Sequence, residues 1–306
     1  MKHSGTEHGR AIASDGVSIA YTTSGRGAAL VCCHAMGVDQ SMWDPHREVF
    51  SRSHQFITFD QRGSGLSEHP PFIGELEGFY TPEKFGEDLC AVLDELKIER
   101  TSILGFSMGA VAALSFATRW PDRVERLILG SAMASRLPEE IVIRARQVEE
   151  VLDASGLEQT YEFYFGGSLF AGLEFGEMLR QAMEKATPHG FKGCFRVTID
   201  RPSLLDQLDT VSAPTLVLVG EQDTHYLPEA DIICERLRDG RKVVVPGAGH
   251  PITVQQPQRC EREVLSFLAG ATTCHGDCGA AAEVPGRSGW SLNWIARWRL
   301  SAVYLV

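Results

Sequence analysis

GFSMG at residues 105–109 is the stretch of sequence that decides the fold. It stands between an apolar run at 102–106, typical of a buried strand, and an alanine-rich helical pattern at 108–119. A strand that turns into a helix around one residue brings its flanks so close that both flanking positions need glycine. Such a turn holds the hydroxyl of Ser107 at the carboxyl end of a sheet, in front of the positive end of a helix. The same sequence motif also occurs in ordinary glycine-rich turns, but its position between a strand and a helix favours Ser107 as a nucleophile.

A serine hydroxyl needs a base that takes its proton and an acid that orients this base. GEQD at 220–223 follows a predicted strand at 215–219, and GAGH at 247–250 follows another at 242–245. The carboxyl ends of parallel strands meet at one edge of a sheet, where Ser107 is also expected. The chain order Ser, Asp, His matches one known solution to this geometry. We predict that His250 is the base.

Two carboxylates compete for the role of the acid. Glu221 lies nearer the end of the predicted strand than Asp223 does. We predict Asp223 as the acid and keep Glu221 as its rival.

A tetrahedral intermediate also needs N–H donors for its negative oxygen. One is predicted to be the backbone N–H of Met108, which follows the nucleophile. The other is expected from HAMG at 34–37, the loop after a predicted strand at 28–33, and we assign it to the N–H of Met36. His34 is interpreted as a residue that structures this loop.

Strand and helix patterns alternate outward from this stretch in both directions. Further strands are predicted at 10–13, 17–23, 55–60 and 124–129, and further helices from Pro82 and at 227–237 and 258–268. This alternation implies an α/β fold with a parallel sheet and right-handed crossovers. Between about 132 and 205 the pattern is helical only, at 139–152, 157–165, 174–184 and 191–199. We therefore predict a core formed by 1–131 and 206–270, a helical cap at 132–205 and an appendage at 271–306.

Composition excludes several classes of function. The chain has 306 residues, with 29 Lys and Arg against 40 Asp and Glu, so its formal net charge is −11. This acidic balance argues against nucleic acid as a partner and against docking on an anionic membrane. No apolar run reaches about 18 residues, and the polar stretch 1–13 has no secretory signal pattern, so a cytoplasmic location without a membrane span is expected. Eight cysteines are too sparse for a disulfide scaffold, and reduced thiols are expected.

From about residue 10 to residue 270 the chain resembles the α/β-hydrolase superfamily. The resemblance includes HAMG at 34–37, DQRGSGLS at 60–67, which looks like that superfamily's D-x-R-G-x-G-x-S loop, and the three sites described above. FSMG at 106–109 is similar to the enol-lactonase, esterase and haloperoxidase-like group. The resemblance implies a mostly parallel sheet of about eight strands with a helical cap. It also implies a serine hydrolase that cleaves a small ester or lactone through an acyl-enzyme on Ser107.

Five positions refine this resemblance. Ala35 stands where the superfamily usually has glycine, and alanine restricts the backbone dihedral angles of the loop that carries the second oxyanion donor. The superfamily's alternative acid position holds Ser131, which supports Asp223. Asp60 and Arg62 are expected to brace loops. Dehalogenases of this superfamily have aspartate at the nucleophile position, so Ser107 disfavours dehalogenation.

The same three residues serve other reactions. A thioesterase and a C–C hydrolase of dienoate substrates are alternatives within the enzyme class, and a hydrolase-fold ligand receptor is the alternative outside it. Aromatic residues of the predicted cap are interpreted mainly as its core: Phe163, Tyr164, Phe165, Phe170, Phe175 and Phe195. No arginine cluster marks a site for a substrate carboxylate, and Arg136, Arg196 and Arg201 stay open as candidates.

The appendage carries two further patterns. CHGDC at 274–278 has the residue types of a metal site, but no second cluster follows, so neither a metal nor a cofactor is predicted. Trp290, Trp294 and Trp298 would form one stripe on a helix. A loosely ordered end is our expectation, with a homodimer contact or docking on the cap as the alternative.

Overall fold

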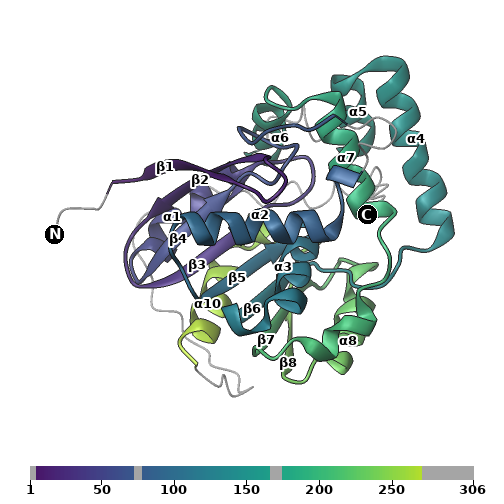
Figure 1. The fold of residues 1–306 in the computed structure, drawn as a ribbon. Coiled ribbons are helices and arrows are strands. Elements are labelled where there is room, and N and C mark those ends of the chain that lie inside the picture. Colours follow the sequence, from purple (N-terminus) through teal and green to yellow (C-terminus); the bar gives the residue numbers. More distant parts are fainter. Residues whose placement is uncertain (1–4, 72–77, 166–173, 271–306) are drawn as a thin grey trace.

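The computed structural model describes residues 5–71, 78–165 and 174–270 (Figure 1). The appendage at 271–306, with its CHGDC motif and tryptophan stripe, lies outside the described residues, as does Phe170.

One twisted sheet forms the centre of the molecule. Its strands are β1 (Glu7–Ile12), β2 (Ser18–Ser24), β3 (Ala28–Cys33), β4 (His54–Phe59), β5 (Thr101–Phe106), β6 (Val124–Gly130), β7 (Thr215–Gly220) and β8 (Gly240–Val245). Within the described residues the order is β1-β2-β4-β3-β5-β6-β7-β8. Strand β2 pairs antiparallel with both β1 and β4, and all the other pairs are parallel. The predicted α/β fold with a mostly parallel sheet of about eight strands is confirmed.

The position of β3 decides where a site can form. Strand β3 pairs with β4 on one side and with β5 on the other, so the winding of the chain reverses there. At such a switch point the loops that leave neighbouring strands diverge and open a crevice at the carboxyl edge. The loops after β3 and β5, which contain Met36 and Ser107, flank this point.

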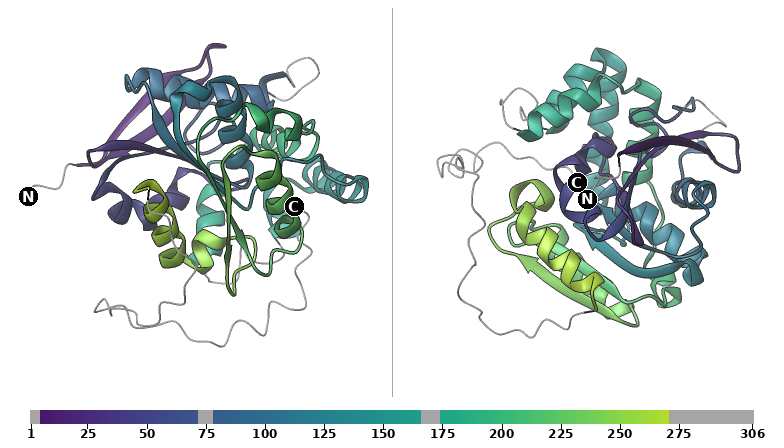
Figure 2. Two further views of the ribbon diagram at one scale, coloured as in Figure 1. Left: turned by 90° about the horizontal axis from the view of Figure 1, so that it is seen from below. Right: turned by 90° about the vertical axis from the view of Figure 1, so that its left-hand side faces the viewer.

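Helices cover both faces of the sheet (Figures 1 and 2). On one face lie α2 (Pro82–Glu95), α3 (Met108–Arg119) and α8 (Tyr226–Arg236), and on the other α1 (Asp44–Ser51) and α10 (Pro257–Leu268). Helix α2 begins as predicted, because the Thr81 side chain accepts a hydrogen bond from the N–H of Lys84 and Pro82 occupies the first turn. Helix α1, which the sequence patterns did not indicate, is only eight residues long and follows a 3₁₀ turn.

The described residues between β6 and β7 include four α-helices. They are α4 (Glu139–Ser155), α5 (Leu157–Phe165), α6 (Glu174–Met183) and α7 (Pro188–Ile199), and Figure 1 shows them grouped beyond one end of the sheet. Contacts tie these inserted helices to the loops at the carboxyl edge. Phe165 packs on Gly37, and Cys194 donates a hydrogen bond to the carbonyl of Arg62. The Nζ atom of Lys185 lies 2.6 Å from the Asp39 carboxylate.

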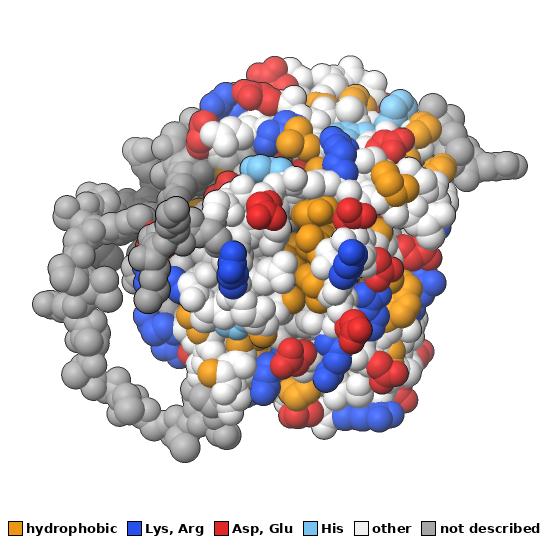
Figure 3. All heavy atoms as spheres, turned by 60° about the vertical axis from the view of Figure 1, so that its left-hand side comes forward, with side chains coloured by type: hydrophobic (Ala, Val, Ile, Leu, Met, Phe, Trp, Pro, Cys, Tyr) orange, Lys and Arg blue, Asp and Glu red, His pale blue; other side chains and the backbone are white. Residues whose placement is uncertain are grey.

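The described cysteines are free thiols, of which Cys32, Cys33, Cys194 and Cys260 are buried. None of the helices within 5–71, 78–165 and 174–270 is long and apolar enough to cross a bilayer. Figure 3 shows one face of the molecule, on which acidic and basic side chains are interspersed around gathered hydrophobic ones.

Candidate active site

Ser107 occupies the sharp turn between β5 and α3. Its backbone has φ 53° and ψ −115°, a conformation that residues with a side chain rarely adopt. A side chain at Gly105 would overlap the Gly109 carbonyl, and one at Gly109 would overlap the carbonyl of Cys33. The two glycines are therefore required by packing. They allow the first turn of α3 to pack closely against β5 and against the end of β3.

The side chains of Ser107, His250 and Asp223 form a continuous hydrogen-bonded chain. Nε2 of His250 lies 3.0 Å from Oγ of Ser107, and its Nδ1 lies 2.9 Å from Oδ2 of Asp223. An ionised carboxylate can only accept, so Nδ1 carries the proton in the neutral imidazole and Nε2 is free to accept from the serine hydroxyl. This is the arrangement that a general base requires. Ser107 and Asp223 are both nearly buried, at 9% and 7% exposure.

The two rival acids have different neighbours. Asp223 lies in the turn that precedes α8 and faces His250. The Glu221 carboxylate instead accepts a hydrogen bond of 2.9 Å from the N–H of Gly247. Of the two, Asp223 is the residue that the structure places against the histidine.

Three residues that the sequence patterns did not single out for this role hold His250 in place. The rings of Tyr226 and Phe106 have centroids 4.5 Å and 5.6 Å from that of the imidazole. Ser131 donates a 3.0 Å hydrogen bond to the carbonyl of His250. The Tyr226 hydroxyl is also a hydrogen-bond partner of the Ser107 side chain, and burial raises the pKa of this phenol, so it stays neutral. Tyr226 stands three residues after Asp223 in the sequence, and this proximity is the signal that could have indicated its role.

The predicted oxyanion donors lie in the segments that follow β3 and β5, at the switch point of the sheet. Met108 is the first residue of α3, so its N–H has no acceptor within the helix. In the facing loop, the N–H of Ala35 donates to Sδ of Met42 at 3.3 Å, and Met36 is the next residue along. Among the described residues, Ala35 is not one with a positive φ, whereas Gly37 has φ 76°. Alanine therefore fits at position 35 without strain.

His34 organises this loop through both ring nitrogens. Its Nδ1 donates to the carbonyl of Ala35 at 2.8 Å, and its Nε2 accepts from the N–H of Gln61 at 3.0 Å. Burial lowers the pKa of His34, although the nearby Asp60 opposes this effect, and the imidazole stays neutral. Asp60 accepts from the N–H groups of Gln40 and Leu66, each at 2.8 Å. These contacts fix the loops after β3 and β4 to one another.

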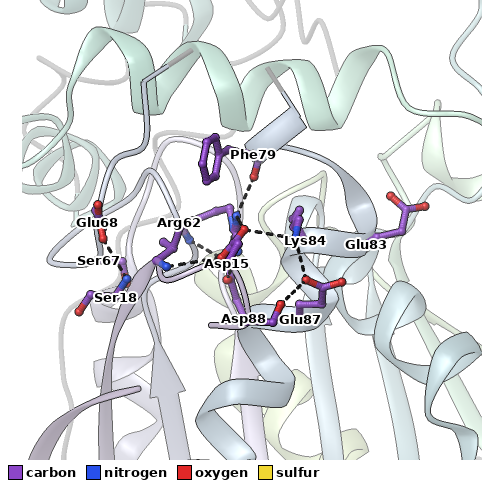
Figure 4. Close-up of polar contacts among 12 residues, drawn as sticks. Asp15, Ser18, Arg62, Ser67, Glu68, Phe79, Glu83, Lys84, Glu87 and Asp88 are labelled. Carbon is purple, nitrogen blue, oxygen red and sulfur yellow. Dashed lines mark hydrogen bonds and ion pairs between the residues drawn. The ribbon is translucent and has the colours of Figure 1, made fainter. Parts of the chain in front are cut away.

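Arg62 is fully buried at the centre of a second network, which Figure 4 shows. Its Nη2 lies 2.6 Å from Asp88, and its Nη1 lies 2.8 Å from Asp15 and donates to the carbonyl of Phe79. Burial raises the pKa of Asp88 to about 6, against the effect of hydrogen bonds from Arg62, so this carboxylate is ionised at neutral pH. With both acids engaged, Arg62 braces the loop after β4 rather than facing Ser107.

A small cavity opens beside Ser107, between the core and the inserted helices. Its lining comprises Ser107, Met108, Val111, Met133, Leu137, Thr198, Arg201 and Tyr226. Four of these eight side chains are apolar, and the polar ones lie around the serine and at the end of α7. Of the three arginines left open by the sequence, the structure brings Arg201 to this cavity.

The described residues contain no group of three or more His, Cys, Asp or Glu side chains placed to hold a metal ion.

A mostly parallel sheet that holds a serine, a histidine and an aspartate at its carboxyl edge, below inserted helices, defines a hydrolase of the α/β class. Residues 30–263 match the protein-family model described as "Alpha/beta hydrolase family". The chain therefore belongs to the alpha/beta hydrolase family, and it is an enzyme of the hydrolase class.

Relatives and solved structures agree with this assignment. The chain is 26% identical to 3-oxoadipate enol-lactonase 2 of Acinetobacter baylyi over 82% of this chain and 93% of that protein. It is 25% identical to a 2-hydroxy-6-oxo-2,4-heptadienoate hydrolase of Pseudomonas putida over 88% of this chain and 99% of that one. The structure of a thermophilic esterase from Thermogutta terrifontis with malate bound superimposes with a TM-score of 0.75 and 27% identity, covering 86% of this chain and 98% of that one.

Proposed function

We propose that the protein hydrolyses a small carboxylic ester or lactone through an acyl-enzyme on Ser107. The observation that carries this proposal is the hydrogen-bonded chain from Ser107 through His250 to Asp223, at the wall of a small cavity with both apolar and polar lining side chains. The names of an enol-lactonase and an esterase among the similar proteins support ester and lactone bonds as the target.

The geometry supports the following sequence of steps. His250 Nε2 takes the hydroxyl proton as Ser107 Oγ attacks the carbonyl carbon, and Asp223 stabilises the resulting imidazolium. The N–H groups of Met108 and Met36 are the proposed donors to the negative oxygen. His250 then returns the proton to the leaving alkoxide, which in a lactone stays attached to the acyl group. A water molecule, deprotonated by His250, hydrolyses the acyl-enzyme and regenerates the serine.

We assign the role of a cap to residues 132–205, over a core of 1–131 and 206–270. The contacts of Phe165 with Gly37 and of Lys185 with Asp39 support this role, since they cover the loops beside the cavity. Helices in this position set the size and polarity of the pocket, and hence the substrate.

A second candidate reaction has support of its own. The relative from Pseudomonas putida is named for a dienoate substrate, so hydrolysis of a C–C bond with the same three residues is the alternative. A thioester is a further target for the same acyl chemistry, and a ligand receptor is the alternative that involves no multiple turnover.

A substrate panel combined with covalent labelling tests the proposal. The panel contains p-nitrophenyl esters of increasing chain length, a lactone, an acyl thioester and a dienoate. We expect repeated turnover of a short ester or lactone, and a fluorophosphonate adduct on Ser107 in peptide mass spectra. Ser115→Ala, which changes a buried serine on α3, is the control that should keep both properties. Labelling that persists in Ser107→Ala, or a single turnover that ends in a stable adduct, would contradict the proposal.

A further inference from the structure

Arg201 is a buried arginine in the cavity that contains Ser107. It follows the end of α7, where the chain returns from the inserted helices to the core, and its exposed fraction is only 5%. Its position places a guanidinium and the proposed nucleophile on the wall of the same small space.

The hydrogen bonds of Arg201 all go to uncharged acceptors. Its Nη1 donates to the carbonyls of Ala134 and Pro202, each at 3.2 Å, and its Nη2 donates to the carbonyl of Met133. Its Nε has no hydrogen-bond partner within the described residues. Over the same part of the chain, no carboxylate forms an ion pair with this guanidinium.

The acidic side chain whose charge acts on Arg201 is engaged elsewhere. Burial lowers the pKa of Arg201, and the nearby Tyr226 and Glu229 oppose this effect. One oxygen of the Glu229 carboxylate accepts from the N–H groups of Ala134 and Ser135, at 2.9 and 2.6 Å. Glu229 thus fixes the backbone after β6 and leaves the guanidinium without a direct counterion.

A buried charge without a counterion is costly, because neutral carbonyls do not replace the solvation that the charge has lost. Another buried arginine, Arg62, provides a comparison with Arg201, because Arg62 does contact two carboxylates, those of Asp15 and Asp88. A purely structural role, in which Arg201 joins the segment after β6 to the end of α7, accounts for the three carbonyl contacts. It does not account for the unsatisfied Nε or for the missing anion.

We propose that Arg201 binds a carboxylate carried by the substrate. This inference rests on the proposed function and narrows its substrate class to esters or lactones that bear a second, ionised carboxyl group. The same cavity is also lined by the apolar side chains of Met108, Val111 and Met133, which suit a short aliphatic spacer. At such a buried side chain a charge-assisted hydrogen bond is stronger than in water.

The test compares half-esters of dicarboxylic acids with neutral esters of similar size. Monoethyl succinate, glutarate and adipate are matched with ethyl butyrate, pentanoate and hexanoate, and hydrolysis is followed by proton release. For at least one pair we expect the wild type to favour the anionic ester in kcat/KM by roughly 10- to 100-fold, the value of a hydrogen bond to a charged group. Equal kcat/KM for the two members of every pair would overturn the inference.

Arg201→Gln should remove this preference, because it should raise the KM for the half-ester more than the KM for the neutral ester. Arg136→Gln removes the same charge from an exposed residue and should leave the preference intact. A purely structural arginine predicts the contrary result, in which Arg201→Gln slows both esters equally. Arg201→Lys keeps a positive charge and should restore part of the preference.

A binding measurement separates failure of this inference from failure of the proposed function. Calorimetry with succinate or glutarate on the Ser107→Ala protein needs no turnover. We expect binding to this variant that disappears when Arg201→Gln is added and that neutral diamides do not reproduce. Binding without any ester turnover would refute the proposed function and leave Arg201 as an anion site. If Arg201→Gln does not fold, the wild-type preference and competitive inhibition by these dicarboxylates decide the question, and the absence of both would overturn the inference.

Discussion

Ser107 combines a strained backbone with a proposed chemical role. Its φ of 53° and ψ of −115° lie in a backbone region that only glycine adopts without strain. Holding another residue in such a conformation costs about 1–3 kcal/mol of folding free energy. Close packing of Gly105 and Gly109 against neighbouring carbonyls holds the turn in this state. Strain and function therefore coincide at this residue.

Two substitutions at Ser107 separate these effects. We expect Ser107→Ala and Ser107→Gly to lower kcat by roughly 10⁴ alike, because both remove the nucleophile. Glycine also relieves the backbone strain, so Ser107→Gly should be more stable than Ser107→Ala by about 1 kcal/mol. Urea unfolding of the two variants measures the difference. Equal stability would show that the turn is not strained.

Asp223 and Glu221 provide a matched pair of carboxylates two residues apart. Asp223→Asn should lower kcat by about 10⁴, because the amide no longer holds His250 in the required tautomer. Glu221→Gln should have little effect, since the Glu221 carboxylate accepts from the backbone N–H of Gly247, and Asp223 is the acid that pairs with His250. Steady-state kinetics on both variants check this. The reverse pattern would make Glu221 the acid.

Among the elements, the contact between α3 and the end of β3 sets the geometry of the proposed oxyanion site. A methyl group on Gly109 would overlap the carbonyl oxygen of Cys33 and crowd that of His34. Gly109→Ala should therefore destabilise the protein by about 1–3 kcal/mol and lower kcat, because the loop or the helix must shift.

Gly249→Ala is the control for this prediction. It also lies beside a residue of the Ser107–His250–Asp223 chain, but its nearest neighbour, the Gln255 side chain, would be 3.6 Å from the new carbon atom. We expect thermal unfolding and kcat close to those of the wild type. Similar losses in both variants would mean that space at Gly109 is not the cause.

The contact between Lys185 and Asp39 joins the inserted helices to the core, and it predicts a pH dependence. Burial alone would raise the pKa of Asp39, but hydrogen bonds from Lys185 and Ser41 lower it below its ordinary value. The contact therefore contributes stability above pH of about 4, the ordinary value, and loses it as the pH falls through the lower folded pKa.

Lys185→Met should thus lower the free energy of unfolding by about 1 kcal/mol at pH 7, because Lys185 is partly exposed. The difference from the wild type should persist to pH of about 5 and shrink below about 4. Urea unfolding across this range measures it. Lys192→Met, which breaks a pair with the exposed Asp153, is the control and should have a smaller effect. A difference that grows in acid would contradict the assignment.

For the molecule as a whole, every residue assigned to the site lies before residue 251, so the last 36 residues are expected to be dispensable for chemistry. A chain that ends after Gly270 should hydrolyse a small ester within about threefold of the full-length rate, because its Ser107, His250 and Asp223 are unchanged. Kinetics are compared together with circular dichroism spectra of both chains. A larger loss in a folded truncated chain would show that the appendage shapes the active site and that its boundary is misplaced.

The sequence by itself determined the elements and the nucleophile turn. The bounds of β3, α3 and α5 agree with the predicted ranges, because strand and helix periodicities and Gly105 and Gly109 are local signals. Short or polar elements were missed, and α7 begins at Pro188 after the capping residue Thr187, three residues before the predicted start.

Only the tertiary structure decided which side chains meet. It placed Asp223, and not Glu221, against His250; it brought Tyr226 and Ser131 to the same histidine; and it left buried Arg201 without a counterion beside Ser107. These contacts join segments that are distant in the chain. Their distances follow from the packing of the sheet and the inserted helices, which no local pattern of residues encodes.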